Sequence, residues 1–364
     1  MVKLPGISIE NRAMKYGYAN ARVKGMKGLL LNPAFLEELI NVRTIDAMVE
    51  LLQRTHYKEE LVKLSLNYSG SALVEIGTAM QFTKIVKKVR ILAPKDETAV
   101  IDGLLRRWDL LNLKTIINAR RSGKKFDSIK PYIFEVGSIT KEELEKIASA
   151  DENEVFMEIK KTDFGREMFS QSTAFFTTPA WNAFNAAVRN ADNFLQIQTI
   201  LDSYFYLLMD KVLNYKNNDV QLIRKIIKKE IDAKNILIIS RLKLANFPKE
   251  KIKQYLIHGG TLKEYAINQI IEARDLIVIA SIIKSKFHNI DIKENPSLVE
   301  LEILLEKAIA AEKVAAFHRS ILSIGVLIGF LLLKEEELNN LRKIAKAKEY
   351  GISENEVKQM LVVV

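Results

Sequence analysis

Cysteine is absent from the sequence of 364 residues, and histidine occurs only four times. Without thiols the chain can form no disulfide, no thiolate metal site and no cysteine nucleophile. The four histidines lie far apart in the sequence, so we expect no histidine metal cluster. Proline and glycine are also scarce, with 7 and 15 residues, and this scarcity favours long helices over turn-rich β architectures.

No apolar run is long enough to span a membrane, which takes ~20 residues. The longest run, 321–333, is shorter than that, and we interpret it as a buried helix. No apolar segment follows Lys3, so the start of the chain does not resemble a signal peptide. We therefore expect a soluble, cytoplasmic protein. Basic residues outnumber acidic ones by 55 to 45, and this excess, spread over the whole chain, weakly favours an anionic partner.

Helical periodicity dominates the sequence. A single core stops growing near ~250–300 residues, so a folded chain of this length should have two or three subdomains. Apolar residues recur at three- and four-residue steps in long segments without proline. These segments are 74–92, 98–121, 180–213, 218–245, 262–286, 298–318 and 320–349.

Local signals mark several helix ends. Pro33 behind Asn32 predicts a first-turn proline after an N-cap. The pairs Thr140/Glu143 and Ser353/Glu356 have the spacing of capping boxes. Strand signals are few, and the best, residues 361–364, could equally be a helix end.

An internal repeat is the most informative feature. Three stretches, offset by 123 and then 105 residues, carry an acid three positions before an asparagine: Asp109 with Asn112, Asp232 with Asn235, and Glu337 with Asn340. Each stretch then ends in a basic segment and a turn residue, at 120–123, 243–246 and 348–351. We predict an all-α protein of three related helical bundles, with approximate boundaries 1–137, 138–260 and 261–364.

The repeated asparagine has two interpretations. An acid and an amide three residues apart share one face of a helix, beside the apolar residues of the bundle core. A buried amide needs hydrogen-bond partners, so the asparagine can brace backbone groups of a neighbouring helix or loop. A catalytic asparagine is the alternative, but catalytic sites are rarely present in triplicate. We favour the brace.

The same stretches, together with 16–24, carry a resemblance to a known family. The segments in question are 106–116, 230–235, 255–260, 323–325, 339–348 and 361–364. In this order and spacing the chain resembles the C subunit of the archaeal-type (A/V-type) ATP synthases, which is related to the d subunit of eukaryotic vacuolar ATPases. Departures are Asn246 where the other repeats have glycine, His258 where many relatives have proline, and Glu337 in place of aspartate.

The resemblance implies a funnel of three pseudo-equivalent bundles around a central opening. It implies a non-catalytic rotor subunit, one copy per complex, without cofactor, metal or small-molecule substrate. Such a subunit is peripheral, on the cytoplasmic side of the cell membrane. Its partners are the central stalk subunits D and F and the membrane proteolipid ring. It links ATP synthesis or hydrolysis to the transport of hydrogen ions or sodium ions.

Differences between the three repeats bear on how such a rotor subunit would hold its partner. Arg107 stands where the other two copies have Glu230 and Glu335. Three similar surfaces could accept a partner in three positions, and a charge of opposite sign on one of them disfavours two of these positions. We therefore expect this difference to help fix a single register on the partner.

Other chemistry finds little support in the residues. Gly123-Lys124 lacks the upstream glycine and the following hydroxyl of a phosphate loop. His56 and Glu59 could supply two metal ligands on one helical turn, but no third is nearby, so we expect a solvated helix start. The alternative function is a basic all-α scaffold that binds nucleic acid, through Gly25–Gly28 as a KH-like loop or through the aromatic cluster between Phe169 and Phe184. A KH loop needs flanking strands, which the sequence does not predict, and no basic residue lies between Phe169 and Phe184. We therefore expect the aromatic cluster to pack between bundles, and we expect no nucleic-acid partner.

Overall fold

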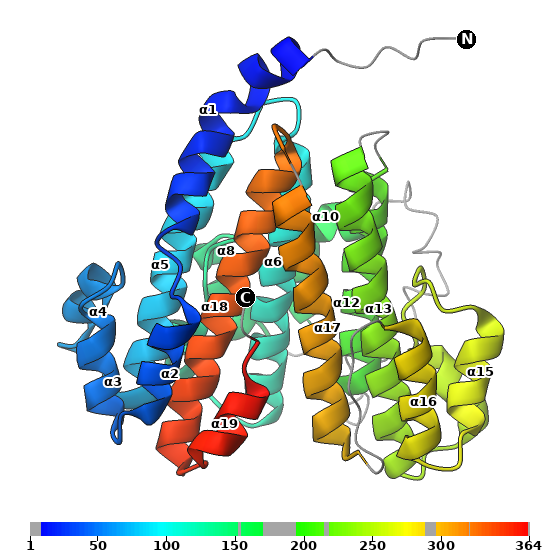
Figure 1. Cartoon of the computed structure of the whole chain (residues 1–364). Helices are drawn as coiled ribbons and strands as arrows, with labels where there is room; N and C mark the ends of the chain where they lie inside the picture. Colours follow the sequence, from blue (N-terminus) through cyan, green and yellow to red (C-terminus); the bar gives the residue numbers. More distant parts are fainter. Residues whose placement is uncertain are drawn as a thin grey trace.

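The computed structural model describes residues 9–151, 154–169, 194–214, 218–287, 296–319 and 321–362. Every regular element within these ranges is helical, which confirms the all-α class. Three antiparallel hairpins of long helices form the body of the molecule (Figure 1). They are α5 (Gly70–Leu92) with α6 (Thr98–Arg121), α12 (Phe194–Val212) with α13 (Asn218–Leu244), and α17 (Leu298–Arg319) with α18 (Ile324–Tyr350).

Shorter helices follow the hairpins or precede the first one. After α6 come α7 (Phe126–Ile129), η1 (Lys130–Tyr132), α8 (Lys141–Ser149), α9 (Val155–Lys161) and α10 (Asp163–Phe169). After α13 come α14 (Lys249–Ile252), η3 (Lys253–Tyr255), α15 (Glu264–Glu272) and α16 (Leu276–Lys286). After α18 comes α19 (Glu354–Met360), and before α5 lie α1 (Ile9–Lys27), α2 (Pro33–Asn41), α3 (Ile45–Leu52) and α4 (Lys58–Leu64).

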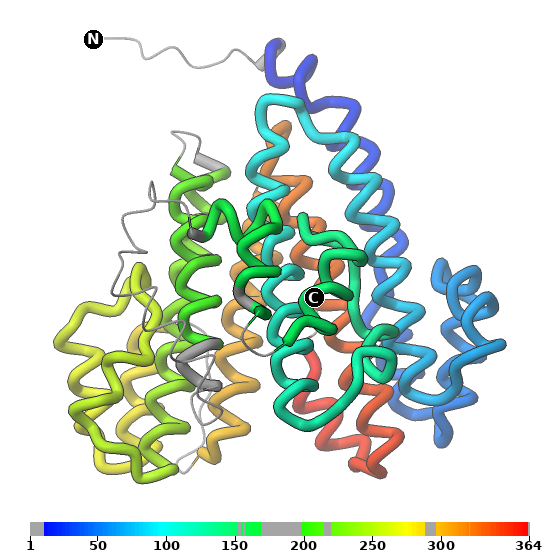
Figure 2. The backbone as a smooth tube through the Cα atoms, turned by 180° about the vertical axis from the view of Figure 1, so that it is seen from behind, coloured from blue at the N-terminus to red at the C-terminus, as the bar shows by residue number. Residues whose placement is uncertain are grey.

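The second helix of each hairpin packs against the first helix of another hairpin. Helix α6 contacts α12, α13 contacts α17, and α18 contacts α5. The last of these contacts joins the two ends of the chain, and α1 and α19 strengthen it by packing on α18 and α2 (Figures 1 and 2). Helices α6, α13 and α18 run in the same direction, downward in Figure 1.

Among the described residues, two hydrophobic cores hold these helices together. The larger core runs between the three hairpins. The smaller core combines Leu39, Met48 and Leu52 of the N-terminal helices with Leu341 and Val357 of the C-terminal helices. This smaller core therefore joins the two ends of the chain.

The local predictions are mostly confirmed. Asn32 caps α2, with Pro33 in its first turn, and both predicted capping boxes are present. The apolar run 321–333 is a buried helix from residue 324 onward. In the part of the chain that the structure describes, no helix is both long and apolar enough to cross a membrane.

Some predicted helix limits differ from the structure. The segment 262–286 is two helices, because Asp275 caps the start of α16 through its carboxylate and interrupts the apolar pattern. Residues 361–362 belong to neither a strand nor a helix. The predicted helix 180–213 is described only from residue 194, and its earlier part lies outside the described residues.

Candidate functional site

The repeated residues form one structural device in three copies, which we call the helix clamp. In each copy a long helix presents an acid, an asparagine three residues later and a base eleven residues after the acid. Eleven residues are close to three helical turns and span roughly 16.5 Å, so all three side chains share one face. The clamp residues are Asp109, Asn112 and Arg120 of α6, Asp232, Asn235 and Lys243 of α13, and Glu337, Asn340 and Lys348 of α18.

The asparagine of each clamp holds a backbone segment 22 residues further along the chain. Its amide nitrogen donates to a carbonyl oxygen, at 2.8 Å, 2.8 Å and 2.6 Å for Asn112, Asn235 and Asn340. Its amide oxygen accepts from the N–H of that same residue, at 3.2 Å, 2.8 Å and 3.0 Å. The held residues are Phe134, Ile257 and Val362. These buried amides are therefore satisfied in the same way three times.

The acid of each clamp binds the N-terminal end of a nine-residue helix. Ile139, Leu262 and Leu31 each stand one position before the N-cap of α8, α15 and α2. Their N–H groups donate to Asp109 at 2.9 Å, to Asp232 at 3.0 Å and to Glu337 at 2.5 Å. A carboxylate is favourable there because helix N-termini carry partial positive charge and unpaired N–H groups.

The base of each clamp binds the other end of the same short helix. Arg120 donates to the carbonyl oxygens of Ala148 and Ala150, at 2.8 Å and 2.6 Å. Lys243 donates to the carbonyl of Ile271. Lys348 donates to the carbonyls of Ile40, at 2.9 Å, and Val42. A cation suits this end, where the helix dipole is negative. Each long helix thus grips a short helix at both ends.

Turn residues complete the clamps. Gly123, Asn246 and Gly351 follow the three bases with positive φ angles of 67°, 54° and 66°. Asn246, a departure from the glycine of the other repeats, therefore adopts the same left-handed conformation, which asparagine tolerates. Gly137 and Gly260 serve a different purpose: a Cβ atom on either would lie 2.1 Å from Oδ1 of Asp109 or Asp232.

The six residues singled out from the sequence are thus distributed over three clamps rather than gathered in one site. The repeat did not reveal that the third clamp grips α2, from the opposite end of the chain. Residues 29–31 lack the glycine and hydroxyl of Gly137-Ser138, so no sequence match pointed to them. The longer Glu337 side chain binds the hydroxyl of Tyr57, at 2.5 Å, in addition to Leu31.

A second feature lies where helices α6, α13 and α18 meet. Arg107, Glu230 and Glu335 occupy equivalent positions in the repeats, again 123 and 105 residues apart. Arg107 contacts Glu230 at 2.7 Å and Glu335 at 3.2 Å. The buried Lys313 of α17 adds contacts to Glu230, at 3.3 Å, and to Glu336, at 2.7 Å. We call these five residues the central ionic cluster.

In this cluster burial disfavours the charged forms of the side chains, whereas their oppositely charged neighbours favour them. Burial disfavours the charge of Arg107, yet Glu230 and Glu335 outweigh it and raise the pKa of the guanidinium. Burial likewise disfavours the charged form of Glu230, but Arg107 and Lys313 lower its pKa. The difference between Arg107 and its two equivalents therefore makes contacts inside the chain, because Arg107 binds both Glu230 and Glu335.

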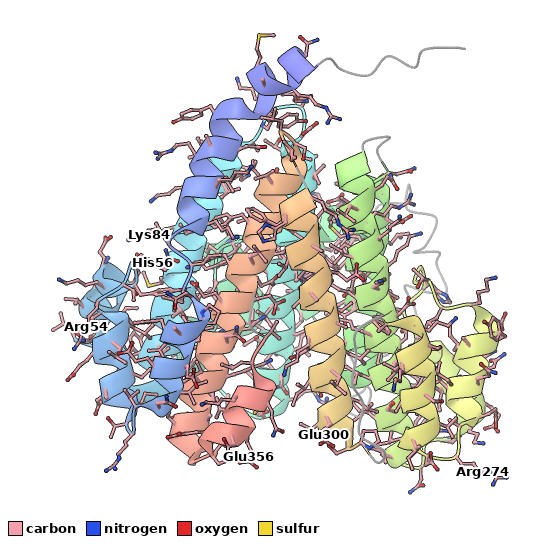
Figure 3. The ribbon with its side chains drawn as sticks, viewed as in Figure 1. Arg54, His56, Lys84, Arg274, Glu300 and Glu356 are labelled. Atoms are coloured by element: carbon pink, nitrogen blue, oxygen red, sulfur yellow. The ribbon has the colours of Figure 1, made fainter. Side chains whose placement is uncertain are left out.

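His56 lies in a third charged group, beside Lys334. Its Nε2 atom is 2.7 Å from Nζ of Lys334, which also donates to Glu337 at 2.6 Å and to Tyr57 at 2.9 Å. The expectation of a solvated helix start holds for Glu59, whose side chain is 81% exposed. It is wrong for His56, which lies among the N-terminal helices in Figure 3 with only 14% of its side chain exposed. Burial and then Lys334 lower the pKa of His56 to about 4, against the opposing effect of Glu337.

This shift predicts a pH dependence of stability. Between pH 6.5 and about 4 the unfolded chain binds a proton at His56 that the folded chain does not, so stability falls as pH falls through this window. We expect a loss on the order of 2 kcal/mol from this group. Urea unfolding at pH 7 and pH 4.5 should show a smaller difference for His56→Gln than for the original chain. An equal difference in both would contradict the assignment.

The brace role of the asparagine gives a separate prediction. Asn235→Leu leaves the N–H and carbonyl of Ile257 without their partners, so the free energy of unfolding should fall by about 1–3 kcal/mol. Thermal unfolding of the purified variant measures this loss. Unchanged melting together with lost assembly into a complex would instead make Asn235 an interface residue.

The other candidate sites were a metal site, a KH-like loop and an aromatic cluster. Within the described ranges, no group of three or more acidic or histidine side chains could hold a metal ion. Gly25 lies in the last turn of α1, not in a loop between strands as a KH motif requires. The aromatic cluster lies outside the described residues, apart from Phe169 at the end of α10.

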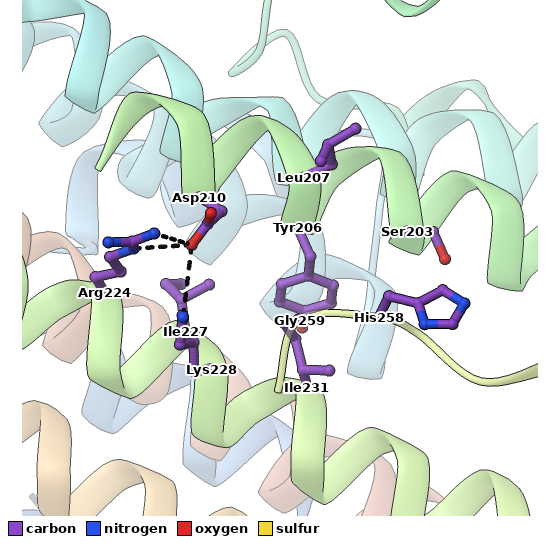
Figure 4. A pocket seen from close by; sticks show the side chains of 10 residues that line it. All are labelled: Ser203, Tyr206, Leu207, Asp210, Arg224, Ile227, Lys228, Ile231, His258 and Gly259. Atoms are coloured by element: carbon purple, nitrogen blue, oxygen red, sulfur yellow. Dashed lines mark hydrogen bonds and ion pairs between the residues drawn. The ribbon is translucent and has the colours of Figure 1, made fainter. Parts of the chain in front are cut away.

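A cavity of about 120 Å³ lies between α12, α13 and the loop at His258 and Gly259 (Figure 4). The charged groups in its wall pair with one another: Asp210 contacts Arg224 at 2.8 Å and Lys228 at 3.9 Å. The remaining wall is mainly apolar.

Comparison with known proteins identifies the family. Residues 19–360 match the family model of the ATP synthase (C/AC39) subunit. The chain is 27% identical to the C subunit of the A-type ATP synthase of Methanococcoides burtonii, over 96% of this chain and 94% of that protein. It is 26% identical to the protein of the same name from Thermococcus onnurineus, over 95% and 90% of the two chains. The chain therefore belongs to the ATP synthase (C/AC39) subunit family, as the resemblance of its repeated segments predicted.

Proposed function

We propose that the chain is a non-catalytic rotor subunit of an A-type ATP synthase, present in one copy per complex. It links the central stalk subunits D and F to the proteolipid ring and so couples ATP synthesis or hydrolysis to ion transport. The observation that carries this proposal is the family match over nearly the full length of the chain. The repeated side chains of the helix clamps bind helices of the chain itself, which agrees with a structural role.

The closed packing order of the hairpins supports a funnel-like arrangement. The contacts α6–α12, α13–α17 and α18–α5 are equivalent steps around one circuit, and equivalent residues meet in the central ionic cluster. We propose three units around a common axis. The helix clamps favour 70–169 as the first unit and 194–287 as the second. The third unit would comprise 298–362 together with 31–64, so it draws on both ends of the chain.

Attachment on the cytoplasmic side of the membrane would then occur through the ring. The stalk should seat on the axis between the units, and one copy of an asymmetric chain offers one seat. With a net charge of +10, the chain should attract acidic surfaces of its partners, and such contacts weaken as salt screens them.

Stalk binding gives the test. Titration calorimetry of the chain with a purified D–F complex should show one-to-one binding whose affinity falls across a series of rising salt concentrations. Three equivalent binding sites per chain, or no binding at any salt concentration, would contradict the proposed link.

A further inference from the structure

The central ionic cluster has an asymmetry that packing alone does not require. The three equivalent positions hold one arginine and two glutamates, so Arg107 bridges α13 and α18 from α6. Lys313 breaks the symmetry again, because it pairs with Glu230 at 3.3 Å and with Glu336, the neighbour of Glu335, at 2.7 Å. Each of the three helices is thereby distinguished from the other two at the point where they meet.

In this cluster Lys313 is buried, while 24% of the Arg107 side chain and 16% of the Glu335 side chain are exposed. Charges that are largely withdrawn from water can define geometry more than they add stability. An apolar junction of similar volume is often as stable as a buried ion network, and it tolerates several relative positions of its helices. Moving one charged helix out of place leaves a buried charge without its partner, which is costly in a medium of low dielectric constant. An ionic junction therefore resists sliding and rotation of the hairpins against one another.

We propose that the central ionic cluster locks the three hairpins in one relative position, with Arg107 and Lys313 as positioning residues. This inference rests on the proposed rotor function: the lock makes the subunit stiff enough to transmit torque between stalk and ring. Without these ion pairs, torque shifts the three units against one another, although each unit remains folded around its own helix clamp.

Moving the arginine between equivalent positions tests the lock in the isolated chain. Arg107→Glu brings three glutamates together, and we expect the melting temperature to fall by roughly 5 °C or more. Adding Glu335→Arg restores one arginine and two glutamates, so most of the loss should be recovered. Adding Glu230→Arg instead should recover much less, because the new arginine lies against Lys313. Equal behaviour of the two double variants, or no effect of Arg107→Glu, would overturn the lock.

The role in coupling is tested in the whole complex, reconstituted in sealed vesicles. Arg107→Gln removes the charge without adding a repulsive one. At equal incorporation of the subunit, we expect ATP hydrolysis to continue while ATP-driven ion transport is lost. Arg107→Lys, which keeps a cation, should retain part of the transport.

Asn235→Leu is the control for loss of stability in general, because it weakens a clamp and leaves the central ionic cluster intact. Ion transport per ATP should be normal in this variant. If it falls as far as in Arg107→Gln, the lock is not a specific coupling element. If instead complexes that lack the chain altogether still transport ions normally, the proposed function fails, and this outcome is distinct from failure of the lock alone.

Discussion

Gly137→Ala is expected to destabilise the chain by about 3–4 kcal/mol, a large effect for the addition of one methyl group. The new Cβ would lie 2.1 Å from Oδ1 and 2.3 Å from Cγ of Asp109. Asp109 is fully buried and accepts hydrogen bonds from Ser138 and Ile139, so it has no free space to move into. The alanine must therefore break the acid end of the clamp. Urea denaturation followed by circular dichroism measures the change.

The matched control is Gly17→Ala in the middle of α1. A Cβ at Gly17 meets no atom within 4 Å, so alanine should stabilise that helix by about 0.5–1 kcal/mol through its better helix propensity. The same substitution thus has opposite signs at the two positions. If Gly137→Ala were as harmless as Gly17→Ala, the tight fit between the glycine and the clamp acid would be wrong.

Lys334→Met should cost about 3–5 kcal/mol, because it removes one partner of a buried ion pair. Only 2% of the Lys334 side chain is exposed, and its Nζ atom lies 2.6 Å from Oε1 of Glu337. The carboxylate of Glu337 would remain buried without its cation. Because Glu337 also holds Leu31, the damage should spread to the contact between the two ends of the chain. Hydrogen exchange of α2 should therefore accelerate in this variant.

Two further variants make this result specific. Lys358→Met removes an exposed ion pair with Glu37, at 2.7 Å, that also joins the two chain ends. Its cost should be much smaller than that of Lys334→Met, because water and salt screen an exposed pair. The double variant Lys334→Met with Glu337→Gln should recover part of the loss, because the uncompensated charge is gone. No recovery, with a single-variant cost like that of Lys358→Met, would show that burial of the pair contributes little.

Sequence reasoning succeeded where the physical cause is local. Prolines and capping residues mark helix ends within a few positions, and the apolar period of a long helix is visible without knowledge of its neighbours. The range of α6 was predicted as observed, because its apolar period is uninterrupted over 98–121. The break before α16 was missed, although Asp275 is an N-cap residue that could have revealed it.

The clamps could be predicted only in part, because their contacts join distant segments. The offsets of 123 and 105 residues identified the acids and asparagines, and the turn residues indicated where each long helix ends. The partner of Glu337 could not be found in the same way, since Leu31 lies 306 residues away and lacks the local motif of the other copies. The central ionic cluster required knowledge of the closed packing order. In the sequence alone, the opposite charges at positions 107, 230 and 335 look like divergence between the repeats. Their pairing becomes apparent only when α6, α13 and α18 are known to meet.

The proposed coupling role is tested most directly by measuring ATP hydrolysis and ion transport together in reconstituted complexes with and without this chain. Without the chain, hydrolysis in the soluble head should continue while no ion gradient forms across the vesicle membrane. Addition of the purified chain should restore the gradient, at one copy per complex. Normal ion transport per ATP in complexes that lack the chain would contradict the role of this subunit as the link between stalk and ring.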